Sequence, residues 1–127
     1  MKTLTITVPS YNAEKYLKED LPSFMADTIL DDLEILIVDD GSRDQTREVG
    51  EKFQEKYPNT VRVISKENGG HGSAVNIGIQ EARGKYFKVV DADDWVDTAS
   101  LVRLIEYLRV SDSDLVLSPF YYVDDYT

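Results

Sequence analysis

Residues 86–95 read YFKVVDADDW, an apolar run that ends in three aspartates. The apolar part is typical of a β-strand, and ligands of open α/β sheets bind at the carboxyl ends of the strands. If the extended backbone continues past the strand, Asp91 and Asp93 point to the same side. Their repulsion is relieved when a divalent cation lies between them and a phosphate. We therefore predict a metal site at Asp93 and Asp91, in preference to a solvated acidic loop, the usual interpretation of such runs.

Predicted strands and helices alternate along the rest of the chain. Further strands are predicted at residues 4–8, 34–38, 61–64 and 115–118. The second of these is almost continuously apolar, as expected of a strand that is covered on both faces. The sequence thus predicts an α/β fold in a single domain over residues 1–127, with a mainly parallel sheet and helices on both faces.

Four helices are predicted between these strands. Three of them have a polar residue at the expected start that can cap free backbone N–H groups, namely Asn12, Asp44 and Asp97. The first helix is expected to bury a stripe made of Tyr16, Leu17, Leu21 and Phe24. Pro22 is expected to kink or end that helix.

The composition excludes several classes of function. The formal net charge is −10, so a nucleic-acid backbone is not the expected main partner. The chain has no cysteine and one histidine, which excludes thiol enzymes, thiolate zinc sites and multi-histidine metal centres. No apolar run approaches the ~20 residues that span a bilayer. The first residues enter a strand directly, with neither a signal peptide nor a transit peptide, which is compatible with a cytoplasmic location.

The loops after the first, second and fourth strands are expected at one edge of the parallel sheet. In the first loop, Tyr11 can stack on a base, whereas Asn12 is more simply explained as a helix cap. In the second loop, Asp39 or Asp40 can accept a hydrogen bond from a base N–H, or either can cap the loop backbone. Gly41 permits a tight turn there.

The single histidine lies in a glycine-rich turn, residues 68–72, before a predicted helix. Free N–H groups at a helix N-terminus suit phosphate oxygens, but the turn matches neither a Walker loop nor the dinucleotide pattern. His71 is therefore either a ligand contact or an ordinary surface residue. Lys66 and Arg43 are alternative sources of positive charge for a phosphate, and the spacing selects neither.

Five motifs, in this order, resemble those of a known enzyme family. They are VPSYN at residues 8–12, IVDDGS at 37–42, NGG at 68–70, AVNIG at 74–78 and DADD at 91–94. The chain looks like the nucleotide-sugar-binding part of a family 2 glycosyltransferase with the GT-A fold, a Rossmann-like sandwich. The resemblance spans nearly the whole chain, and it is far less specific for the sugar that is moved.

The resemblance also implies roles for particular residues. The nucleotide-binding residues that it implies are Pro9, Tyr11, Asp40, Gly70, His71, Asp91 and Ala92, and the metal-binding residues are Asp93 and Asp91. Pro9 and Tyr11 would frame the nucleobase, and Asp40 would hydrogen-bond a uracil-like edge. Asp93 would bind the Mg²⁺ or Mn²⁺ that carries the diphosphate, while Asp91 would contact the ribose or the metal shell.

The reaction implied by the resemblance is inverting transfer of a sugar from a nucleotide diphosphate, with UDP expected, to an acceptor hydroxyl. The expected acceptors are carbohydrates or glycolipids of bacterial polysaccharide assembly. The family's general base lies well beyond the metal motif, and only ~33 residues follow Asp94. We therefore expect the base and the acceptor-binding part beyond residue 127, together with any peripheral contact with the inner face of the cell membrane. The chain alone is expected to bind nucleotide sugar weakly and to transfer little.

Two alternative functions stay open on the sequence. A sugar-phosphate nucleotidyltransferase has a similar sheet, but its first loop is usually rich in glycine, arginine and lysine, unlike residues 9–12. A non-enzymatic, flavodoxin-like or receiver-type nucleotide-binding module also carries acids at strand ends. The arrangement of residues 91–93 after the fourth strand does not fit that module.

Overall fold

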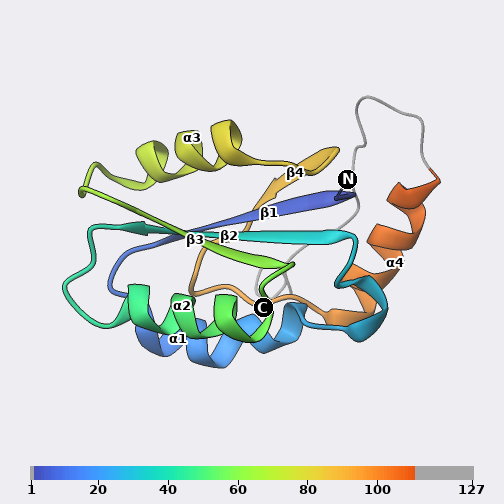
Figure 1. Ribbon diagram of the computed structural model, residues 1–127, viewed down its shortest axis with the longest axis horizontal. Helices are drawn as coiled ribbons and strands as arrows, with labels where there is room; N and C mark the ends of the chain where they lie inside the picture. Colours follow the sequence, from blue (N-terminus) through green and yellow to red (C-terminus); the bar gives the residue numbers. More distant parts are fainter. Residues whose placement is uncertain (1, 111–127) are drawn as a thin grey trace.

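A computed structural model describes residues 2–110, which form a parallel sheet with flanking helices (Figure 1). The strands lie in the order β3-β2-β1-β4. Their bounds are Leu4–Ser10 for β1, Leu33–Asp40 for β2, Val61–Lys66 for β3 and Tyr86–Val89 for β4. The strand predicted at residues 115–118 lies outside the described residues.

The two central strands carry the core of the sheet. Every residue of β1 and β2 is buried, and their register pairs Leu4 with Leu33 and Val8 with Ile37. Such continuous burial requires cover on both faces, as the apolar sequence of β2 predicts. β4 pairs with β1 at the edge of the described sheet, and Phe87 is 37% exposed there. This strand is therefore less buried than its apolar sequence suggests.

Helices cover both faces of the sheet (Figure 1), which confirms the predicted α/β sandwich. Helix α3 (His71–Glu81) packs on β1 and β2 from one face. On the other face, α2 (Thr46–Lys56) packs on β3 and β2, and α1 (Glu14–Asp20) packs beside α2. No helix within residues 2–110 is both long enough and apolar enough to cross a membrane.

Helix α4 (Thr98–Arg109) contacts two short 3-10 helices, η1 (Leu21–Phe24) and η2 (Asp27–Ile29). Its buried stripe consists of Leu101, Leu104, Ile105 and Leu108. The Asp97 carboxylate accepts a hydrogen bond from the N–H of Ala99 at 3.1 Å. Asp97 therefore caps α4 as predicted.

The other two predicted caps differ in the structure. Ala13 occupies the cap position of α1, and the side chain of Asn12 bonds to the next loop instead. The first N–H of α1, that of Glu14, donates to Asp44 Oδ2 at 3.4 Å. The prediction for Asn12 as a cap is wrong. Asp44 does accept a hydrogen bond from the first N–H of α2, that of Thr46, at 2.9 Å. However, Gln45 occupies the cap position, so Asp44 lies one residue before the cap rather than at it.

The first helix also ends earlier than its apolar stripe. α1 stops at Asp20, and η1 follows with Pro22 in its first turn, because proline cannot supply the N–H that a longer helix needs. The buried members of the predicted stripe are Leu17, Leu21 and Phe24. Tyr16 is 46% exposed, so its predicted burial is wrong. Its side chain lines a pocket rather than packing under the sheet.

Candidate functional site

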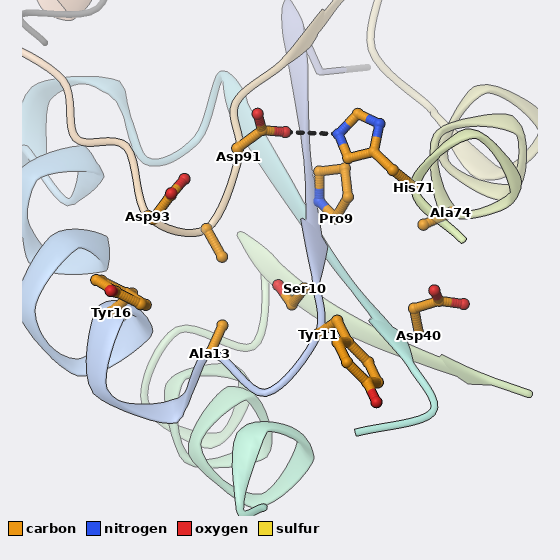
Figure 2. Close-up of a pocket in the computed structure, with 11 residues that line it drawn as sticks. Pro9, Ser10, Tyr11, Ala13, Tyr16, Asp40, His71, Ala74, Asp91 and Asp93 are labelled. Carbon is orange, nitrogen blue, oxygen red and sulfur yellow. Dashed lines mark hydrogen bonds and ion pairs between the residues drawn. The ribbon is translucent and has the colours of Figure 1, made fainter. Parts of the chain in front are cut away.

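A pocket lies at the carboxyl edge of the sheet, beside the ends of β1, β2 and β4 (Figure 2). Its lining consists of Pro9, Ser10, Tyr11, Ala13, Tyr16, Asp40, His71, Ala74, Asp91, Ala92 and Asp93. Every site residue predicted from the sequence except Gly70 belongs to this lining. The pocket also includes four residues that the sequence did not assign to it, of which Ser10 and Ala74 lie within the motifs and Ala13 and Tyr16 lie shortly after the first motif.

The acidic residues after β4 gather through a turn. The predicted extended backbone is wrong, because β4 ends at Val89 and the N–H of Asp94 closes a turn on the carbonyl of Asp91 at 2.9 Å. Asp91, Asp93 and Asp94 nevertheless place carboxylate oxygens within 4.8 Å of one another. Oxygens on opposite sides of one Mg²⁺ ion lie roughly 4 Å apart, so the spacing of the cluster is of the order that such an ion requires. Hard carboxylate ligands suit Mg²⁺ or Mn²⁺.

His71 lies inside the pocket rather than on a remote surface. It is the first residue of α3, and its Nε2 is 2.7 Å from Oδ1 of Asp91. Figure 2 shows the imidazole reaching across to the aspartate. This contact joins the start of α3 to the acidic turn, and both side chains remain about half exposed.

Asp40 is buried, and most of the acceptor positions of its carboxylate are occupied by hydrogen bonds. Oδ1 accepts hydrogen bonds from Lys66 Nζ at 2.7 Å and from the N–H of Gly69 at 2.9 Å, and Oδ2 accepts from the N–H of Gly70 at 2.9 Å. Burial raises the pKa of Asp40, but these hydrogen bonds and the lysine charge outweigh it and lower that pKa below 3.8. The interpretation in which an aspartate of this loop caps the loop's own backbone holds for Asp39, whose carboxylate accepts from the N–H of Ser42. Asp40 instead caps the glycine-rich turn before α3. Lys66, the last residue of β3, neutralises Asp40.

Close contacts also fix the loops relative to one another. The Asn68 side-chain amide donates to the carbonyl of Asp40 at 3.0 Å. Gly41 has a φ of 70°, and a Cβ there would lie 2.6 Å from the backbone nitrogen of Asn68, so only glycine fits. The Asp39 carboxylate accepts from the N–H of Ser42 at 3.1 Å. The loop after β2 is thus packed against the glycine-rich turn that precedes α3.

The pocket has two chemically different ends (Figure 2). Tyr11, which is 49% exposed, and Asp40 lie at one end. Asp91 and Asp93 lie at the other, with His71 beside Asp91. One end offers an aromatic ring and a hydrogen-bond acceptor, and the other offers carboxylates suited to a cation.

Comparison with known proteins agrees with this arrangement. The family described as "Glycosyl transferase family 2" matches residues 5–127, nearly the whole chain. The chain belongs to glycosyltransferase family 2. This assignment confirms the predicted family and, with the structural neighbours described next, the GT-A fold. It favours a glycosyltransferase over the nucleotidyltransferase and the receiver-type module.

Other members of the family share the sequence and the fold. The Bacillus subtilis protein named "Uncharacterized glycosyltransferase EpsJ" is 41% identical over 118 residues, which cover 93% of this chain and 34% of EpsJ. The crystal structure of S. aureus TarS 1-349 in complex with UDP-GlcNAc has a TM-score of 0.72 and 32% identity, and covers 86% of this chain and 31% of that one. The mannosyltransferase PcManGT from Pyrobaculum calidifontis, in complex with GDP-Man and Mn²⁺, has a TM-score of 0.74 and 26% identity, and covers 86% and 32%. The family 2 chain thus spans about a third of the length of these relatives.

Proposed function

We propose that this family 2 domain binds a UDP-sugar together with Mg²⁺ or Mn²⁺, as the donor-binding part of an inverting glycosyltransferase. The observation that carries the proposal is the two-ended pocket, with Tyr11 and Asp40 opposite Asp91 and Asp93. A nucleoside diphosphate has a matching shape, because a flat base at one end is joined through a ribose to a diphosphate that binds cations. The complexes of TarS with UDP-GlcNAc and of PcManGT with GDP-Man and Mn²⁺ support this choice of ligand.

The metal is assigned to the acidic end. Asp93 is exposed, and no lysine, arginine or histidine among residues 2–110 forms an ion pair with it. Asp93 is therefore proposed as the main metal ligand, with Asp91 in the metal shell or at the ribose. A bound Mg²⁺ or Mn²⁺ would stabilise negative charge on the departing diphosphate as a Lewis acid.

The hydrogen bonds of Asp40 favour uracil over guanine. A carboxylate has about four acceptor positions, and three of those on Asp40 are taken, two on Oδ1 and one on Oδ2. The free position on Oδ2 suits a base edge with one N–H donor, as in uracil. Guanine presents neighbouring N–H groups that would need both oxygens. Pro9 and Tyr11 are proposed to hold the base from the side of β1, with Gly70 and Ala92 supplying backbone near the nucleotide.

We propose that the general base and the acceptor-binding groups lie outside the described residues. An acceptor hydroxyl attacks the anomeric carbon opposite the leaving diphosphate, so the C–O bond to phosphate breaks as the new C–O bond forms and the configuration inverts. The proton of the hydroxyl goes to a general base that we place beyond residue 127. Carbohydrates or glycolipids are the proposed acceptors, and the proposed site of action is the cytoplasm. We accordingly propose that the 127-residue chain is one donor-binding domain with little transferase activity alone.

Calorimetric titration with UDP and GDP, in MnCl₂ and in EDTA, tests the proposal. We expect binding of UDP that depends on Mn²⁺ and is about tenfold tighter than that of GDP, because an unmatched N–H donor costs about 1.4 kcal/mol or more. Equal affinity for the two nucleotides would overturn the base assignment. UDP binding that is the same in EDTA would overturn the metal assignment.

A further inference from the structure

The residue after Tyr11 adopts a backbone conformation that few side chains tolerate. Asn12 has a φ of 49°, and it is the one non-glycine residue with a positive φ among residues 2–110. This left-handed region disfavours side chains with a Cβ, and asparagine is among the few residues that enter it regularly. The strained position lies directly beside the exposed aromatic ring of the pocket.

Two hydrogen bonds join Asn12 to the loop after β2. The side-chain Oδ1 accepts from the N–H of Arg43 at 2.9 Å, and the backbone N–H of Asn12 donates to Ser42 Oγ at 2.9 Å. The partners are about thirty residues away in sequence, so these bonds connect two separate loops of the pocket. The N–H of Ser42 in turn donates to the carboxylate of Asp39, the residue before Asp40 at the end of β2.

The backbone on both sides of Tyr11 is therefore held in place. On one side, Ser10 is buried in β1 and its hydroxyl donates to the carbonyl of Val8 at 3.0 Å. On the other side, the N–H of Ala13 donates to Thr46 Oγ1 at 2.8 Å. The Tyr11 ring is half exposed, but its main chain has little freedom to move.

We propose that Asn12 is a positioning residue, which holds Tyr11 in place to stack on the base of the bound nucleotide. The inference rests on the proposed function, because it assumes a nucleobase at Tyr11. A loop that is ordered before the ligand arrives loses less conformational entropy on binding. Asparagine supplies both requirements: it tolerates the left-handed backbone, and its amide oxygen accepts the N–H of Arg43.

Substitutions at Asn12 separate these two requirements. Asn12→Ala loses both, and we expect the dissociation constant of UDP with Mn²⁺ to rise about tenfold, because a loop that is not held in advance loses more conformational entropy on binding. Asn12→Asp keeps an acceptor and tolerates the conformation, so its affinity should stay within about twofold of the parent chain. Asn12→Gly keeps the conformation alone and should lie between the two. Circular dichroism checks the fold of each variant, and the aspartate and glycine variants keep the test informative if the alanine variant unfolds.

A double-mutant cycle with Tyr11→Ala distinguishes positioning from a general structural role. If Asn12 acts through Tyr11, Asn12→Ala should have little further effect on UDP affinity once the ring is absent. Affinity for pyrophosphate with Mn²⁺, which has no base to stack, should be unchanged by Asn12→Ala. An equal loss of UDP affinity in both backgrounds, or an equal loss for pyrophosphate, would overturn the inference. If the parent chain binds pyrophosphate and UDP with the same affinity, no base is recognised, and the base assignment under the proposed function fails first.

Discussion

The acidic side chains at the amino edge of the sheet have more basic partners than those in the turn after β4, at the carboxyl edge. At the amino edge, the buried Glu34 accepts hydrogen bonds from Thr5 Oγ1 at 2.9 Å and from the N–H of Arg83 at 2.8 Å. The Arg62 guanidinium lies 3.5 Å from the same carboxylate. The carboxylate of Glu34 therefore has both hydrogen-bond donors and a positively charged partner from the same chain.

Asp32, also at the amino edge, follows the same pattern. Its carboxylate pairs with Arg109 at 2.6 Å and accepts from Thr3 Oγ1 at 2.8 Å. Burial raises the pKa of Asp32, but the bonds from Thr3 and Arg109, with the charge of Arg109, outweigh it and lower that pKa. The pair connects the end of α4 to the start of β2.

At the carboxyl edge, Asp40 is paired with Lys66, but the acids of the turn after β4 are short of positive charge. Asp91 has one histidine beside it, His71, and Asp93 pairs with no basic side chain of residues 2–110. Both acids line the pocket. The comparison teaches that the acids neutralised within the chain hold the fold together, whereas those left in excess are available to a cation and its ligand.

Glu34→Ala should have the largest effect on stability. It leaves the Thr5 hydroxyl and the N–H of Arg83 without their buried acceptor, while Arg62 keeps its ion pair with Glu81. We therefore expect the free energy of unfolding to fall by about 3 kcal/mol. Urea unfolding at neutral pH measures the loss. UDP binding with Mn²⁺ should not change, because the amino edge is distant from the pocket.

Two controls sharpen this result. Glu34→Gln keeps an oxygen for the N–H of Arg83 and should lose less stability than the alanine variant. Glu51→Ala removes an exposed pair with Arg47 on α2 and should change the free energy of unfolding by less than about 0.5 kcal/mol. A Glu34→Ala variant of unchanged stability but weakened UDP binding would contradict the assignment of the two edges.

Helix α3 begins at the pocket and continues over the packed sheet, so its two glycines should respond differently to alanine. A Cβ on Gly78 would lie 2.3 Å from Thr7 Cγ2 in the buried face of β1. We expect Gly78→Ala to lower the free energy of unfolding by about 2 kcal/mol through overpacking. A Cβ on Gly72 meets nothing within 4 Å, so Gly72→Ala should stabilise the helix by up to about 1 kcal/mol. Thermal and urea unfolding of both variants check this, and equal losses would contradict the packing described for α3.

Asp40 lies at the carboxyl edge, but like the paired acids of the amino edge it should contribute to stability, and protonation at low pH should remove that contribution. Its pKa is lowered in the folded chain, so its contribution to stability is complete above the ordinary value of 3.8 and is lost as the pH falls below that value. We expect this contribution to be about 1 kcal/mol, since a hydrogen-bonded carboxylate is favoured over its neutral form. Asp40→Asn should flatten the fall in unfolding free energy below about pH 4. If urea unfolding shows the same pH slope for the variant and the parent, the description of Asp40 is wrong.

The sequence predicted the strands of residues 2–110 and the edge that carries the site, because apolar runs mark buried strands and parallel strands end together. It also predicted the gathering of Tyr11, Asp40 and Asp93 in one pocket. It did not predict the bond between Asn12 and the loop after β2, because a partner thirty residues away leaves no local pattern. Tyr16 has the spacing of a core residue, yet it is half exposed and lines the pocket, which its spacing alone does not indicate.

The role of Lys66 becomes clear only from the register between β2 and β3. Asp40 and Lys66 are partners at the ends of two neighbouring parallel strands, where opposite charges meet. The sequence offered Lys66 only as a free charge for a phosphate. Once β2 and β3 are aligned by their apolar residues, this lysine pairs with Asp40 and is no longer free.

Thermal unfolding with UDP, with and without Mn²⁺, tests most directly whether the acids of the carboxyl edge hold a cation. A ligand that binds only the folded chain raises its melting temperature. For the parent chain and for Asp31→Ala, which removes an exposed acid away from the pocket, we predict a rise that requires Mn²⁺. For Asp93→Ala we predict no Mn²⁺-dependent rise, and a full Mn²⁺-dependent rise in that variant would contradict the account.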